Sequence, residues 1–274
     1  MAAKQGSIVE RVIHRLVRKH ISGPTMGSAI ARAKEYNKKG MPVSINFISS
    51  APQDKARANY NTTTYMQLAR EIARMGIKAT VHLKLEQLGS GLEREYAARN
   101  LDSILAVARK AGVFVWCELT DPFSETLLLE HVHDGKGMGV AVHSLEEAIR
   151  YAKANKAIKE LKIMLGKKEL DGKHEKTEPI ESITKSLRSV VLNSPNEGLA
   201  SKLSKKGTKY RSSLILEFQL GYGEKKLGKM AKKGSRISVV IPFGKDWASY
   251  AMTNVPEGYT RALANRLLHE GMGD

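Results

Sequence analysis

From residue 43 onward, short apolar runs rich in β-branched residues alternate with longer segments whose apolar residues recur at helical spacing. Short, continuously apolar runs are typical of strands that are buried on both faces of a parallel sheet. Eight strands are predicted, at 43–48, 79–85, 113–119, 139–143, 161–165, 189–192, 214–219 and 237–241. Each is followed by a predicted helix, at 62–74, 93–110, 124–133, 145–154, 180–188, 197–204, 225–233 and 246–253.

Eight strand–helix units within 274 residues have the size and order of an α/β (β/α)8 barrel of the TIM type. A doubly wound open sheet is the alternative fold, and it is less favoured because eight regular units need no second domain. We expect a single domain with two parts. Residues 1–40 are predicted to form an N-terminal helical segment packed on the barrel, and residues 41–274 to form the barrel itself.

The last predicted unit is the stretch 238–257, with the sequence SVVIPFGKDWASYAMTNVPE. Its strand is expected to end before Pro242, because proline cannot donate a hydrogen bond to a sheet ladder. Asp246 then stands where an N-cap residue would begin the final helix. In a barrel of this type, such a strand end and the loop after it belong to the face that carries the chemistry.

Electric charge is the most unusual property of the composition. The chain has 45 Lys and Arg against 28 Asp and Glu, a net charge of +17. Of this excess, +12 falls within 153–236, where 21 basic residues face 9 acidic ones. The basic clusters there contain Lys167, Lys168, Lys202, Lys205, Lys206, Lys209, Arg211, Lys225, Lys226, Lys229, Lys232, Lys233 and Arg236. Such clusters favour a polyanionic partner, with RNA or a ribosome as the hypothesis, although a solvated or thermophile-type surface has the same composition.

The N-terminal segment 7–21 has an apolar helical face, with Arg11, Arg15 and Arg18 along another face. We interpret it as a docking helix that adds to the polyanion-binding surface. A transit peptide and attachment to an anionic membrane surface are the alternatives. No apolar run approaches the roughly 18 residues that a membrane-spanning helix requires, so a cytoplasmic location is predicted. The single cysteine, Cys117, excludes an internal disulfide framework and is predicted to be buried.

Candidate chemistry lies at the predicted carboxyl ends of the strands. In HLKLEQLG, the alternation of a strand places His82 and Lys84 on one side, so Lys84 is expected to face the barrel mouth. A charged group in that position is costly unless an anion or a cofactor meets it. The pair His131 and His133 has no third ligand at a useful spacing, and no metal site is predicted.

Four segments, HLKLEQLG, GVFVWCELTD, LEFQLGYG and VIPFGKDWASY, together resemble the proline dehydrogenase family, in the right order and over about 250 residues. The resemblance implies a (β/α)8 barrel that binds FAD over its strand ends and oxidises proline to pyrroline-5-carboxylate by hydride transfer to the flavin. By position it also implies that Lys84, Tyr250 and Glu257 belong to the substrate site. Glu118, His143 and Gln219 would belong to the FAD site.

Several family positions differ in this sequence. The paired arginines that hold the proline carboxylate fall at Thr253 and Asn254, which cannot form a charged fork with a carboxylate. The motif lysine of strand 5 is Leu165, and the Thr-His-Asp motif after strand 6 reads as residues 192–194, Leu-Asn-Ser. We therefore expect a non-catalytic member that binds RNA or ribosomes. The alternative is an FAD-dependent dehydrogenase that acts on proline or a related amine.

Overall fold

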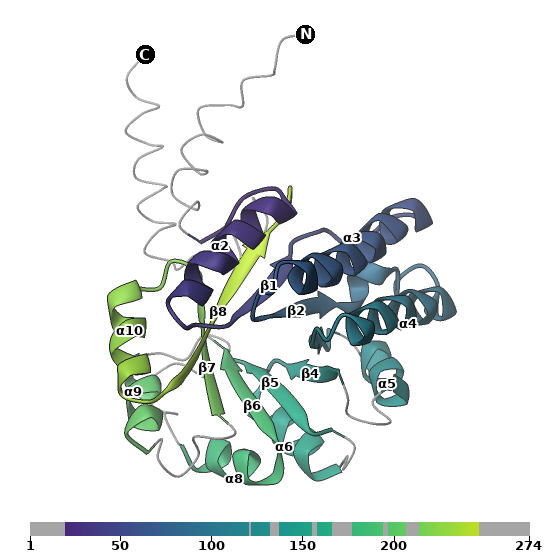
Figure 1. Ribbon diagram of the computed structural model, residues 1–274. Coiled ribbons are helices and arrows are strands. Elements are labelled where there is room, and N and C mark those ends of the chain that lie inside the picture. The colour runs from purple at the N-terminus through teal and green to yellow at the C-terminus, as the bar shows by residue number, and fades with distance from the viewer. Residues whose placement is uncertain are drawn as a thin grey trace, which may run out of the picture.

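The structure is a computed structural model, and it describes residues 20–120, 122–131, 137–154, 158–165, 177–193, 197–206 and 214–246. Its centre is one closed sheet of eight parallel strands, each paired with the next, with β1 and β8 closing the ring (Figure 1). The strands are β1 (Val43–Phe47), β2 (Ala79–Lys84), β3 (Val115–Glu118), β4 (Met138–Val142), β5 (Glu160–Met164), β6 (Ser189–Asn193), β7 (Leu214–Gln219) and β8 (Arg236–Phe243). The predicted (β/α)8 barrel is confirmed.

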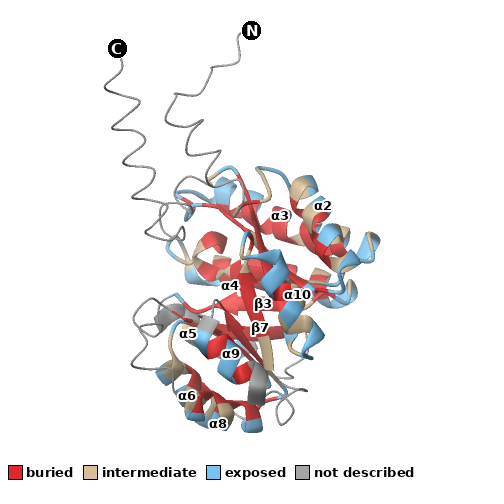
Figure 2. Ribbon diagram, turned by 90° about the vertical axis from the view of Figure 1, so that its left-hand side faces the viewer, coloured by how far each residue is buried: buried red, intermediate tan, exposed pale blue. Residues whose placement is uncertain are grey.

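Helices surround the sheet and leave their polar faces in solvent (Figure 2). They are α2 (Met26–Lys38), α3 (Lys55–Arg74), α4 (Arg94–Lys110), α5 (Pro122–His131), α6 (Leu145–Ala154), α8 (Glu178–Ser186), α9 (Glu197–Lys206) and α10 (Glu224–Lys232), with the short 3-10 helix η1 (Leu85–Leu88) after β2. Helix α2 buries Ala29, Ile30, Ala33 and Tyr36 in the core. Most of the predicted docking helix, 7–19, lies outside the described residues, so the division into 1–40 and 41–274 stays a prediction.

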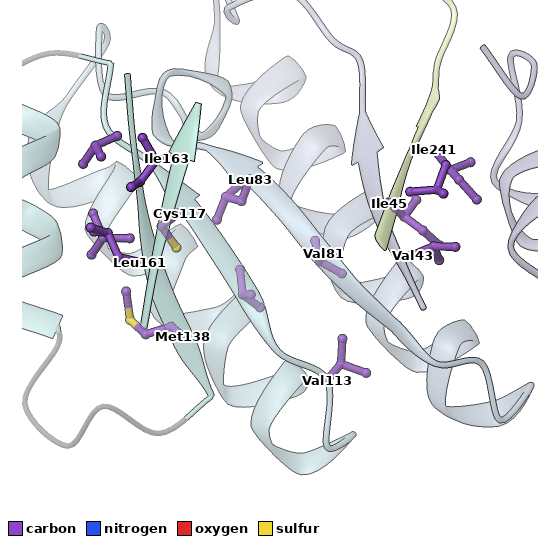
Figure 3. Packing of buried hydrophobic residues seen from close by; sticks show 14 of the residues in the cluster. Val43, Ile45, Val81, Leu83, Val113, Cys117, Met138, Leu161, Ile163 and Ile241 are labelled. Atoms are coloured by element: carbon purple, nitrogen blue, oxygen red, sulfur yellow. The ribbon is translucent and has the colours of Figure 1, made fainter. Parts of the chain in front are cut away.

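Alternate residues of each strand pack in two different environments. Val43, Ile45, Val81, Leu83 and Ile163 belong to the apolar core cluster that joins the strands to the helices (Figure 3). These residues are at most 1% exposed, which explains why each strand appears in the sequence as an apolar run. The residues between them point into the barrel, and many of those are polar.

The prediction that the last strand ends before Pro242 was wrong. Strand β8 continues to Phe243, with Pro242 opposite Asn46 of β1. On its other side β8 has lost its neighbour, because β7 pairs no further than Val240. The missing N–H of Pro242 therefore breaks no ladder bond, and its carbonyl accepts hydrogen bonds from the backbone N–H and the hydroxyl of Ser22 at 2.9 and 2.8 Å.

The start of a helix also differs from its prediction. Helix α3 begins at Lys55, well before the predicted residue 62, because the Asp54 carboxylate caps it by accepting from Arg57 N at 2.7 Å.

Cys117 is buried among apolar side chains, as predicted, and burial raises the pKa of its thiol to about 12. No helix among the described residues combines the length and the apolar character that crossing a membrane requires.

Candidate active site at the carboxyl end of the barrel

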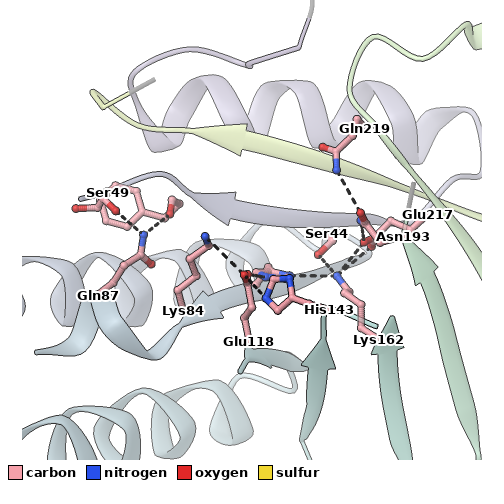
Figure 4. Close-up of polar contacts among 12 residues, drawn as sticks. Ser44, Ser49, Lys84, Gln87, Glu118, His143, Lys162, Asn193, Glu217 and Gln219 are labelled. Carbon is pink, nitrogen blue, oxygen red and sulfur yellow. Dashed lines mark hydrogen bonds and ion pairs between the residues drawn. The ribbon is translucent and has the colours of Figure 1, made fainter. Parts of the chain in front are cut away.

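Three of the residues selected from the sequence meet at the carboxyl ends of the strands. Lys84 and Glu118 are the last residues of β2 and β3, and His143 directly follows β4 (Figure 4). Glu118 Oε1 lies 3.1 Å from His143 Nε2 and 3.6 Å from Lys84 Nζ. The Glu118 side chain is only 2% exposed, whereas those of Lys84 and His143 are 37% and 49% exposed. One buried carboxylate thus holds a lysine ammonium group and a histidine ring at the mouth.

His82 lies two residues before Lys84 on β2, and it binds the carboxylate of Glu118 from inside the barrel. His82 Nε2 lies 2.6 Å from Glu118 Oε2, and its Nδ1 lies 3.3 Å from Lys162 Nζ. An ammonium group can only donate, so we assign His82 as the neutral tautomer that accepts at Nδ1 and donates from Nε2 to Glu118. Burial, reinforced by the charge of Lys162, lowers the pKa of His82, which agrees with this assignment.

The electrostatics of Glu118 and His143 follow from this arrangement. Burial alone would raise the pKa of Glu118, but hydrogen bonds from His143 and His82 hold it well below its ordinary value. The hydrogen bond to Glu118 raises the pKa of His143. Glu118 is therefore an anchor that stays ionised near neutral pH and orients its neighbours. It is too weak a base in this state to take a proton from a substrate.

Beneath this cluster the barrel is filled by a charged layer. Ser44, Trp116, Lys162 and Glu217 come from β1, β3, β5 and β7, the alternate strands that share one layer of a (β/α)8 interior. Lys162 Nζ is 2.9 Å from Glu217 Oε2 and 3.1 Å from Ser44 Oγ, and 5.3 Å from the centroid of the Trp116 ring. We call these four residues the central layer. Both charged side chains are almost completely buried.

Gln219 occupies the opposite side of the mouth from Glu118. Its amide donates to Asn193 Oδ1 at 3.4 Å, and Asn193 donates to Glu217 Oε2 at 2.6 Å (Figure 4). Gln219 is thus connected to the central layer, and through Lys162 and His82 to Glu118. The described polar side chains of the interior form one chain of contacts from His143 to Gln219.

Sequence reasoning did not identify Lys162 and Glu217 as site residues. Both are charged residues within apolar strand runs, LKIM and LILEF, at the positions that alternation assigns to the barrel interior. This in-and-out alternation was the feature of the sequence that could have identified the two residues. The sequence could not show that the Lys162 side chain of β5 contacts the Glu217 side chain of β7 inside the barrel.

Comparison with known proteins agrees with the predicted resemblance. No family model matches the chain. It is 24% identical over 263 residues to proline dehydrogenase 1 of Bacillus subtilis subsp. natto, an alignment that covers 88% of this chain and 86% of the relative. It is 22% identical over 259 residues to proline dehydrogenase 2 of B. subtilis strain 168, covering 87% and 85%. The chain is a divergent relative of the proline dehydrogenases.

Solved structures with the same fold include parts of larger proline utilization A (PutA) proteins. PutA of Bdellovibrio bacteriovorus, in a form inactivated by N-propargylglycine, superposes with a TM-score of 0.69 at 14% identity over 86% of this chain. PutA of Corynebacterium freiburgense superposes with a TM-score of 0.65 at 14% identity over 96% of this chain. This chain spans about a third of each of them, 32% and 35%, and the likeness concerns the barrel fold.

Several positions that the resemblance singled out fall among the described residues. Leu165, at the position of the family's motif lysine, is buried and apolar at 8% exposure. Asn193 is 5% exposed and binds Glu217. Asp246 accepts hydrogen bonds from Ser50 N and Oγ and from Arg57 Nη2, at 2.8, 3.0 and 3.1 Å, and its role as an N-cap stays a prediction. Tyr250, Thr253, Asn254 and Glu257 lie outside the described residues, and the helix that Asp246 would cap does so as well.

The basic residues selected from the sequence lie on the outer helices, at the start of β8 or outside the described residues. Lys225, Lys226, Lys229, Lys232 and Lys233 are exposed on and just after α10, and Arg236 is the exposed first residue of β8. Lys202 is exposed on α9, which also contains Lys205 and Lys206. Arg11, Arg15, Arg18, Lys167, Lys168, Lys209 and Arg211 are not among the described residues. Within the described part of the chain, no group of three or more His, Cys, Asp or Glu side chains is arranged to hold a metal ion.

Proposed function

We propose that this protein is a flavin-dependent oxidoreductase of the proline dehydrogenase type that oxidises a small amine. The observation that carries the proposal is the cluster of Lys84, Glu118 and His143 at the carboxyl mouth of the barrel. A lysine and a histidine held by one buried carboxylate are suited to meeting an electron-rich partner at this mouth. The alignment with curated proline dehydrogenases over 88% of the chain supports the same conclusion.

The described side chains at the mouth fit FAD as the cofactor. Lys84, His143 and Gln219 come from β2, the end of β4 and β7, and each carries an N–H donor at the rim. The edge of an isoalloxazine ring is rich in hydrogen-bond acceptors, which these donors complement. When bound, the flavin supplies the two-electron acceptor for a hydride.

Within this proposal the chain's own residues act by orientation and charge. Glu118 fixes Lys84 and His143 in place, and His82 holds the other oxygen of Glu118. The Lys84 ammonium group, together with His143 when it is protonated, stabilises negative charge that develops on the cofactor or is carried by the substrate. Because the family's arginine pair corresponds to Thr253 and Asn254, the substrate carboxylate has no charged fork at those positions. We therefore propose a small secondary amine as the substrate class, with proline as the first compound to test.

Absorption spectroscopy and a substrate series test the enzyme proposal. Purified protein reconstituted with FAD should show the visible flavin bands, and a substrate should bleach them without oxygen and reduce a quinone in turnover. Pyrrolidine should be oxidised at least as well as proline, because it needs no carboxylate fork. Lys84→Met should lower kcat/KM about 100-fold, whereas Lys110→Met, an exposed lysine at the end of α4, should leave it unchanged. A protein that takes up no FAD would refute the proposal.

The exposed lysines of α10 support a second candidate, the binding of a polyanion such as RNA or a ribosome. Four of them fall within one short helix, and Lys233 follows directly. The proline dehydrogenase relatives give no support to this function or to the expected loss of activity. If the candidate is right, co-sedimentation with ribosomes should weaken steeply with salt, and the reversal Lys229→Glu, Lys232→Glu, Lys233→Glu should weaken it further. No binding at low salt would end it. The cytoplasmic location stays a prediction.

A further inference from the structure

A cavity lies at the opposite end of the barrel from the candidate active site. It has a volume of about 440 Å³, and its lining includes Val43, Ala79, Glu160, Ser189 and Arg236, which are the first residues of β1, β2, β5, β6 and β8. Its inner end is formed by residues of the barrel interior, among them Trp116 and Glu217 of the central layer. This amino-terminal cavity is therefore separated from Lys84 and His143 by the length of the strands.

One wall of the amino-terminal cavity is aromatic and firmly supported. Trp116 contacts Phe114 edge-on, with 4.9 Å between the ring centroids, and the Lys162 ammonium group lies 5.3 Å from the Trp116 ring centroid. Gly139 on β4 leaves the space that the indole occupies, since a Cβ at Gly139 would lie 2.5 Å from Trp116 Cζ3. Trp116 is only 3% exposed, whereas Phe114 is partly exposed, so the wall presents the Phe114 ring with Trp116 fixed behind it, and a planar ligand can lie against this apolar surface.

The rim of the amino-terminal cavity carries positive charge. Arg188 and Arg236 line it, with Glu160 as the one acidic residue of the rim. Arg188 Nε donates to Glu160 Oε1 at 2.8 Å, which fixes the guanidinium at the cavity edge. The second carboxylate of the lining, Glu217, is already neutralised by Lys162 at 2.9 Å. The four charged side chains of the lining sum to zero, and Lys162 behind Glu217 adds one positive charge to the interior of this end of the barrel.

The surrounding helices strengthen this positive potential. Each helix that follows a strand runs back toward the amino ends of the strands, so its last turn lies on the side of the amino-terminal cavity. The last-turn basic residues of these helices are Arg74, Arg109, Lys110, Lys153, Lys185, Lys229 and Lys232. Cations gathered around a concave site raise the local concentration of anions.

We propose that the amino-terminal cavity is a binding site for a small organic anion with a flat apolar body. The carboxylate or phosphate of the ligand lies at Arg188 and Arg236, and its ring lies against Phe114 and Trp116. The hydroxyl groups of Ser189 and Ser238, which also line the cavity, supply further hydrogen bonds. This site is independent of the proposed amine oxidation, and its ligand is not a substrate of the carboxyl mouth.

Tryptophan fluorescence tests the proposal, because Trp116 is one of only two tryptophans in the chain. In a Trp247→Phe background, the remaining signal comes from the cavity wall. Benzoate and phenyl phosphate should change it saturably. Benzyl alcohol, a neutral ligand of similar size, and inorganic phosphate, a charge without a ring, should bind at least tenfold more weakly. Equal responses to benzoate and benzyl alcohol would overturn the assignment of an anion site.

Three substitutions locate the site. Arg236→Gln should weaken benzoate binding about tenfold or more, because a charge-assisted hydrogen bond is lost. Lys78→Gln removes an exposed charge next to the first residue of β2 without changing the lining, and should have less than a twofold effect. Ile215→Phe, which fills the cavity, should abolish binding. Binding that is insensitive to Arg236→Gln, or equally sensitive to Lys78→Gln, overturns the proposal even if Ile215→Phe does not fold.

Discussion

The substitution Lys162→Met tests whether the central layer works as a charge-compensated unit. It removes the ammonium group that contacts Glu217 at 2.9 and 3.2 Å, Ser44 at 3.1 Å and His82 at 3.3 Å. Glu217 then keeps only Asn193 at 2.6 Å and Ser238 at 3.4 Å as hydrogen-bond partners. Removing one partner of a buried ion pair costs about 3–5 kcal/mol, because the other charge remains in the interior without compensation.

That cost is a large share of a stability of about 5–15 kcal/mol, and corresponds to a fall in Tm on the order of 10 °C. Urea unfolding followed by circular dichroism measures it. The double variant Lys162→Met, Glu217→Gln should recover most of the loss, since the carboxylate that Lys162→Met leaves uncompensated is then neutral. If Lys162→Met costs less than about 1 kcal/mol, or if the double variant is less stable than the single one, the charges of the central layer are not coupled as described.

Two further predictions concern the mouth and the aromatic wall. The hydrogen bond to Glu118 raises the pKa of His143, so this contribution to stability is complete below the unfolded-state pKa of histidine, about 6.5, and is lost as pH rises through the folded-state value. His143→Gln should therefore destabilise the protein more at pH 6 than at pH 9 in chemical unfolding. The difference should be less than about 1 kcal/mol because the side chain is half exposed. An equal loss of stability at both pH values would contradict this prediction. Gly139→Ala should cost about 1–3 kcal/mol in thermal unfolding, because its Cβ would lie 2.5 Å from Trp116 Cζ3, whereas Gly228→Ala in α10, with nothing within 4 Å, should be neutral or slightly stabilising; equal effects of the two would rule out the clash.

The order of strands and the fold were predictable because a parallel barrel imposes two simple patterns on the sequence. Apolar runs mark strands that are buried on both faces, and helical spacing marks the outer layer. The ends of elements were less predictable. Helix α3 starts at Lys55 because of a cap at Asp54, while its first turn is exposed and contributes no apolar periodicity. Likewise, Pro242 is compatible with β8 only because β7 has already ended, which is a fact about a neighbouring strand.

The candidate site was predictable where one strand carried the information. Lys84 was selected from the parity of its own strand, and Glu118 and His143 from the resemblance and their places at strand ends. Lys162 and Glu217 depend on contacts across the barrel between β5 and β7, which no local pattern encodes. The amino-terminal cavity depends in the same way on Gly139, whose importance is visible only with the indole of Trp116 beside it.

The central layer also limits how this sequence can change. Lys162 and Glu217 neutralise each other in the interior. Replacing either one alone therefore leaves the other as a buried charge without its partner. Exchanging Ser44, Trp116, Lys162 and Glu217 together for well-packed aliphatic residues would produce the kind of interior that most barrels have. A series of single substitutions from the charged interior to the aliphatic one therefore passes through less stable proteins. A redesign of this barrel should therefore replace all four residues of the central layer together or keep all four.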